Sequence, residues 1–188
     1  MQPTIFFLSR CFSPIYNHRS DEYGGLAINR ARILVEILKV IRKQMPELHI
    51  SIKINFHDYM AGGVTPQDAQ IACKALVEHG IDYIEISANG TSQTGINPMQ
   101  NEAYFLDFAL ELKKAVNIPV ILVGGHPSME NMTAILNKTP VEYFSLSRPL
   151  IREPDLPKRW QAGDLRPSTC ISCNNCYGAP GKRCAYER

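Results

Sequence analysis

The sequence has 188 residues, of which 45% are hydrophobic and 20% are charged, a balance typical of one globular domain with a buried core. Its 20 basic and 18 acidic residues leave a net charge of only +2. A charge this small gives no electrostatic reason to expect a nucleic acid or an anionic membrane as a partner.

The N-terminal segment contains a short apolar run, Ile5–Leu8, without a basic region before it. A signal peptide needs a longer apolar stretch, and a membrane-spanning helix needs about twenty such residues. We therefore expect a cytoplasmic protein. In that reducing compartment, the six cysteines are expected to be free thiols or metal ligands and not a disulfide framework.

Hydrophobic periodicity from residue 28 onward predicts helices that alternate with strands. The second helix has a suitable N-cap in Thr65 and a proline, Pro66, at its first position. The predicted helices span residues 28–44, 65–79, 101–116 and 128–138. The predicted strands span residues 50–56, 82–87, 119–123 and 142–146.

The strand–helix pairs recur at intervals of about thirty residues, which is the size of a β/α unit. This alternation indicates an α/β fold with a parallel sheet covered by helices. No GxGxxG motif follows a strand, which argues against a dinucleotide-binding Rossmann domain. An eight-stranded barrel needs about 200–250 residues, so four units amount to half of one. We expect residues 1–165 to form this half-barrel and residues 166–188 to form an irregular, cysteine-rich tail.

Two loops at predicted strand ends have the composition of a phosphate site. Gly124 and Gly125 end the third strand, and glycine lets backbone N–H groups approach a ligand closely. The next helix begins near Ser128, and a helix N-terminus favours an anion. One unit later, Ser147 and Arg148 bring a hydroxyl, an N–H group and a guanidinium, which pairs bidentately with phosphate. Because such loops share one rim of a barrel, we expect them to bind phosphate together.

Lys53 lies within an otherwise apolar strand and has two interpretations. Its ammonium either faces solvent, or it points to the barrel mouth and stabilises an electron-rich ligand edge such as the N1/C2=O side of a reduced flavin. Further candidates for ligand contact are His126, beside the glycine pair, and Asn89, Thr91 and Asn97, in the loop after the second strand.

The segment Phe12–Gly25, followed by Asn29–Arg32, resembles the old yellow enzyme family of NADH:flavin oxidoreductases, where it follows the fourth barrel strand. The four predicted strands are similar to strands five to eight of that barrel. The resemblance covers nearly the whole chain but only the second half of the family's barrel. It therefore implies the second half, strands 5–8, of a (β/α)8 TIM barrel.

The resemblance implies FMN as the cofactor, NAD(P)H as the electron donor and a small-molecule acceptor such as an activated alkene. It places Lys53 beside the pyrimidine ring of the flavin. It places Gly124, Gly125, Ser147 and Arg148 at the FMN phosphate. Ser147 stands where many members have glycine, but a serine still donates its backbone N–H.

The chain departs from the family at the proton donor. The family has a histidine-rich motif that ends in a tyrosine at strand four, and Phe6 stands at the place of this tyrosine, with Thr4 and Met1 near the histidines. Phenylalanine has no proton to donate, so we predict no catalytic residue in this chain. We expect an isolated chain to be inactive and to self-associate or to pair with an N-terminal half, because an exposed strand edge favours pairing.

The tail contains the spacing C-x2-C-x2-C-x7-C. Four thiolates this close suit tetrahedral zinc or an iron–sulfur cluster. The tail resembles the cluster-binding segment of the family's multidomain members, in which the last two gaps are longer. The two alternatives are a metal or cluster site and a remnant with free thiols. The four candidate ligands are Cys170, Cys173, Cys176 and Cys184.

Three hypotheses follow from the sequence. The first is an FMN-dependent oxidoreductase of the ene-reductase type that needs a partner half. The second is a truncated fragment that folds without catalysing a reaction. The third is a metal- or cluster-binding module organised by the tail.

Overall fold

A four-stranded parallel sheet, with the strand order β1-β2-β3-β4, forms the centre of the protein. The structure, a computed structural model, describes residues 7–89 and 92–186. The predicted parallel α/β fold is confirmed, and each strand lies within one residue of its predicted ends. The strands are β1 (Ser51–Asn55), β2 (Tyr83–Ser87), β3 (Val120–Val123) and β4 (Tyr143–Ser145).

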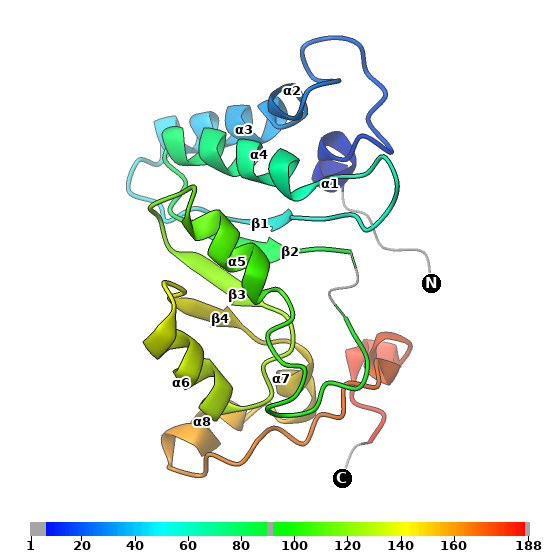
Figure 1. Ribbon diagram of the computed structural model, residues 1–188, viewed down its shortest axis with the longest axis vertical. Helices are drawn as coiled ribbons and strands as arrows, with labels where there is room; N and C mark the ends of the chain where they lie inside the picture. Colours follow the sequence, from blue (N-terminus) through cyan, green and yellow to red (C-terminus); the bar gives the residue numbers. More distant parts are fainter. Residues whose placement is uncertain (1–6, 90–91, 187–188) are drawn as a thin grey trace.

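The helices pack along the sheet in chain order, with α3 and α4 side by side above β1 and α6 beside β4 (Figure 1). Within the described ranges no helix is long and apolar enough to cross a membrane. The helices are α1 (Phe7–Phe12), α2 (Ala27–Arg30), α3 (Arg32–Gln44), α4 (Pro66–Glu78), α5 (Leu106–Lys113), α6 (Met129–Lys138), α7 (Arg148–Arg152) and α8 (Leu156–Gln161), followed by the 3-10 turns η1 (Asn175–Tyr177) and η2 (Pro180–Lys182).

The two faces of the sheet differ because side chains alternate along a strand. Ile54, Ile84 and Leu122 are at most 3% exposed and belong to the main apolar core, which the helices cover. The alternate residues of each strand point to the other face, where Lys53 and Tyr143 are exposed. The face opposite the helices is therefore the more open one.

The segment Phe12–Gly25 is held to the helices by Arg30, which is only 5% exposed. Its guanidinium donates to the carbonyl oxygens of Phe12 and Gly25 and pairs with Asp68 at the start of α4. Gly24 is required here because a Cβ atom would stand 1.9 Å from the carbonyl oxygen of Arg19. These contacts give a structural reason for the residues that carry the family resemblance.

The predicted helix starts are largely confirmed. Thr65 caps α4, since its hydroxyl accepts from the N–H of Asp68 at 3.2 Å and the Asp68 carboxylate accepts from the N–H of Thr65 at 3.1 Å. Ser128 caps α6 by accepting from the N–H of Asn131 at 3.3 Å. The predicted helix 28–44 is divided at Ala31 into α2 and α3.

The predicted helix 101–116 is wrong at its start, because α5 begins only at Leu106. The preceding residues bond to the loop after β3: Ala103 N–H donates to the Gly125 carbonyl at 2.8 Å, and Tyr104 N–H donates to the Gly124 carbonyl at 3.1 Å. Ala103 also has a positive φ of 54°, which is incompatible with a continuing helix. This long-range pairing replaces the local helical hydrogen bonds and shapes the loop that carries the glycine pair.

Two short helices, α7 and α8, follow β4 in a segment for which the sequence predicted no helix. Leu156 and Trp160 of α8 form a small apolar cluster with Met132 of α6. The tail then contacts the loop between β3 and α6, where the N–H of Ser168 donates to the carbonyl of Pro127 at 2.7 Å. The domain boundary between residues 165 and 166 stays a prediction.

Candidate functional site

All five predicted cofactor residues line one cavity of about 180 Å³ beside the carboxyl ends of β3 and β4. Gly124 and Gly125 directly follow β3, and Ser147 and Arg148 follow β4. Lys53 reaches the same cavity from β1. The structure thus places the two predicted phosphate loops side by side, as a shared binding site requires.

Four backbone N–H groups of this cavity have no acceptor within the described part of the chain. They belong to Gly124, Gly125, Ser147 and Arg148. A polar backbone group that is not bonded to the protein needs water or a ligand as its partner. Four such donors around one small cavity form a suitable cradle for an oxyanion such as phosphate.

Arg148 supplies the positive charge of this cradle and is only 7% exposed. Its Nη1 donates to the Gln93 carbonyl at 2.5 Å, to Asn174 Oδ1 at 2.7 Å and to the Ser172 carbonyl at 3.4 Å. These acceptors are all neutral, and among the described residues no carboxylate forms an ion pair with Arg148. Because a buried charge without a counter-ion is unfavourable, this arginine is suited to an anionic ligand.

The glycine pair is required by a neighbouring aromatic ring as well as by the backbone. Gly124 and Gly125 have φ values of 114° and 73°. A Cβ atom on either glycine would lie 2.9 Å or 2.8 Å from the ring of Tyr104, respectively. The glycines therefore admit the Tyr104 ring against the loop. Their expected role in the close approach of a ligand stays a prediction.

Lys53 is partly exposed to solvent and also lines the cavity, so both of its predicted environments are present. It lines the cavity, but its side chain is 49% exposed and its ammonium pairs with Glu85 at the register position opposite it on β2. The charge of Lys53 is thus shared with a carboxylate, in contrast to that of Arg148.

His126 lies in the cavity wall and is 3% exposed. Neither ring nitrogen has a hydrogen-bond partner among the described residues, and burial lowers the pKa of His126 to about 4. The imidazole is therefore neutral at pH 7. Its ring packs edge-on against Phe144, with the two centroids 5.0 Å apart.

Two other loop candidates, Asn89 and Asn97, do not line this cavity. Asn89 donates to the Asp58 carbonyl at 2.8 Å, and the Asn97 N–H donates to Asn101 at 2.7 Å. Thr91, Phe6, Thr4 and Met1 lie outside the described residues.

The wall residues that sequence reasoning missed include Tyr104, Ser172 and Tyr177. Tyr104 was assigned to a helix, and the other two lie in the tail. No local signal in the sequence identifies them, because each reaches the cavity through contacts between segments that are distant along the chain.

The four tail cysteines line a second cavity of about 200 Å³, which shares Arg148 and Cys170 with the first. The pKa of the Cys176 thiol is raised, mainly by burial and further by the nearby thiols of Cys170 and Cys173. Arg152 Nη1 lies 3.8 Å from the sulfur of Cys184. The thiols therefore gather around one space bordered by two arginines.

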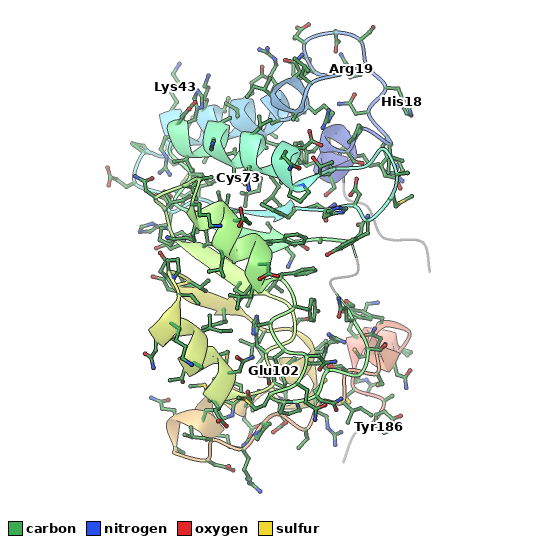
Figure 2. The ribbon with its side chains drawn as sticks, viewed as in Figure 1. His18, Arg19, Lys43, Cys73, Glu102 and Tyr186 are labelled. Atoms are coloured by element: carbon green, nitrogen blue, oxygen red, sulfur yellow. The ribbon has the colours of Figure 1, made fainter. Side chains whose placement is uncertain are left out.

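No group of three or more His, Cys, Asp or Glu side chains in residues 7–89 and 92–186 is arranged to hold a metal ion. The four tail thiols line one cavity, but they are not arranged around a single ion position. Cys73 is separate from them, since it is fully buried in the core (Figure 2), and its burial raises the pKa of this thiol to about 12.

Comparison with known proteins identifies relatives of the chain. Residues 1–166 match the family described as NADH:flavin oxidoreductase / NADH oxidase. The chain is 28% identical to a bilirubin reductase from Clostridium symbiosum, over 94% of this chain and 52% of that protein. It is 32% identical to an NADH oxidase from Thermoanaerobacter brockii, over 92% of this chain and 28% of that protein.

The fold is similar to the solved structure of the old yellow enzyme homologue from Zymomonas mobilis, with a TM-score of 0.66 and 22% identity. That match covers 89% of this chain and 46% of the neighbour. The chain thus spans about half, or less, of the length of these relatives. The extent of the family match nevertheless settles its origin: the chain belongs to the NADH:flavin oxidoreductase / NADH oxidase family.

Proposed function

We propose that this chain is the FMN phosphate-binding half, strands 5–8, of a (β/α)8-barrel oxidoreductase of the ene-reductase type, which uses NAD(P)H to reduce a small-molecule acceptor. The observation that carries the proposal is the cavity beside β3 and β4. There a buried Arg148 without a carboxylate partner meets four backbone N–H groups without an acceptor. This donor set suits the phosphate dianion of FMN.

In this proposal each residue has a distinct task. Gly124, Gly125 and Ser147 donate backbone N–H groups to the phosphate, and Arg148 neutralises its charge. Lys53 stands on the open face of the sheet, where its ammonium favours negative charge on the pyrimidine side of a flavin. The flavin itself supplies hydride transfer between NAD(P)H and the acceptor.

A partner half is part of the proposal. The edge strands β1 and β4 each pair on one side only within the described sheet, and the face opposite the helices is open. We expect an N-terminal half or a second copy of the chain to complete the sheet. The isolated chain is then an inactive fragment, since Phe6 cannot donate a proton. A clean monomer in light scattering at micromolar concentration would argue against self-association.

A second function is favoured by the cavity that the four tail cysteines share. The resemblance of the tail to the cluster-binding segment of the family's multidomain members favours a cluster over zinc. Cys170, Cys173, Cys176 and Cys184 are the proposed ligands, and a remnant with free thiols in a cytoplasmic protein is the alternative.

The proposed function is tested by titrating the chain with FMN and with riboflavin and following the quenching of flavin fluorescence. The two ligands differ only in the phosphate. Contacts to a charged group contribute about 1.5–3 kcal/mol each, so two retained contacts predict FMN binding about 1,000-fold tighter than riboflavin binding. Equal affinity for the two ligands would refute the phosphate site.

A further inference from the structure

The side chain of Asn174 joins two segments that are distant in the sequence. Its Oδ1 accepts from Arg148 Nη1 at 2.7 Å, and its Nδ2 donates to the carbonyl of Ser92 at 2.5 Å. The orientation of the amide follows from these partners, because a guanidinium only donates and a carbonyl only accepts. One amide therefore connects the phosphate-binding arginine to the loop after β2.

The contact with Asn174 fixes the orientation of the Arg148 guanidinium. The guanidinium is a rigid planar fork, so acceptors fixed on Nη1 orient the whole group. Two of the three acceptors of Nη1, Asn174 Oδ1 and the Ser172 carbonyl, come from the cysteine tail. The side chain of Tyr104 also forms a hydrogen bond with Arg148.

The tail is anchored at this point by a further contact. The hydroxyl groups of Tyr177 and Ser92 lie 2.5 Å apart, so two tail residues bind the same loop residue. The tail runs beside the loop that follows β2 (Figure 1). Asn174 itself has a left-handed φ of 65° and lies between Cys173 and Cys176. The residue that bonds Arg148 is therefore a direct neighbour of a tail cysteine in the sequence.

We propose that Asn174 is a positioning residue, which holds the Arg148 guanidinium in the orientation that binds phosphate. This inference rests on the proposed function.

The test compares Asn174→Gly with Asn175→Gly in the full chain. Glycine tolerates the positive φ at residue 174, so the first variant removes the amide without backbone strain. Asn175 is exposed and its side chain makes no hydrogen bond among the described residues, which makes its variant a matched control. FMN and riboflavin affinities are measured by fluorescence quenching in each variant, with and without Arg148→Gln.

We expect Asn174→Gly to weaken FMN binding about tenfold, to leave riboflavin binding unchanged and to have no further effect when Arg148 is glutamine. Asn175→Gly should bind both flavins as the unaltered chain does. If Asn174→Gly leaves FMN binding intact while Arg148→Gln weakens it, this inference is wrong and the proposed function stands. An equal loss for both flavins would indicate general damage and also overturn it. If the unaltered chain does not prefer FMN to riboflavin, both proposals fall.

Discussion

Replacing Arg148 by glutamine is expected to weaken FMN binding about 100-fold and to leave riboflavin binding nearly unchanged. Glutamine keeps some of the length and polarity of the side chain but removes its charge and its bidentate donor geometry. Four neutral backbone donors then remain for the phosphate, so the preference for FMN should fall to about tenfold rather than vanish. Isothermal calorimetry or flavin fluorescence measures both affinities.

The matched control for this variant is Arg166→Gln. Arg166 carries the same charge but is exposed and pairs with Asp164, at 2.6 Å. Its loss removes one positive charge from the chain without altering either cavity, so FMN affinity should stay within about twofold. If both variants weakened FMN binding equally, the effect would be one of net charge, and the assignment of Arg148 would be wrong.

Anaerobic reconstitution with iron and sulfide is expected to give a brown protein whose visible absorption bleaches on reduction. The substitution Cys176→Ser is expected to abolish this absorption. Cys176 is the most buried of the four tail thiols. Burial raises the pKa of this thiol, so it needs a nearby cation to become a thiolate. Iron and sulfide analysis together with the absorption spectrum measures cluster content.

Cys11→Ser is the control for the cluster experiment, since Cys11 lines a separate cavity formed with α1, α3 and the Phe12–Gly25 segment. It should retain full cluster content. A colourless protein that binds one zinc ion through the tail would show that the tail is a zinc site and not a cluster site. A protein that binds neither iron nor zinc would leave the tail as a remnant with free thiols.

The strands and the relation between the two phosphate loops follow from sequence patterns. Each strand is a short β-branched or apolar run, and consecutive β/α units place successive strand ends on one edge of a parallel sheet. That rule alone brings Gly124–Gly125 beside Ser147–Arg148 in the expected cavity. The capping box at Thr65 is equally local and was predictable for the same reason.

The remaining features depend on contacts between distant segments. Residues 101–105 were predicted to be helical, yet the carbonyls of Gly124 and Gly125 accept the N–H groups of Tyr104 and Ala103 instead. The tail spacing predicted a metal site but contained no indication that Arg148 would line both the cysteine cavity and the predicted phosphate cavity. The bond between Asn174 and Arg148 spans 26 residues of sequence, so no local pattern reveals it.

The most direct test of the account is a crystal structure of the chain with FMN bound. We predict that the phosphate lies between the loop of Gly124–Gly125 and the loop of Ser147–Arg148, within hydrogen-bonding distance of their backbone N–H groups and of the Arg148 guanidinium. A phosphate bound elsewhere, with those N–H groups bonded only to water, would contradict the account.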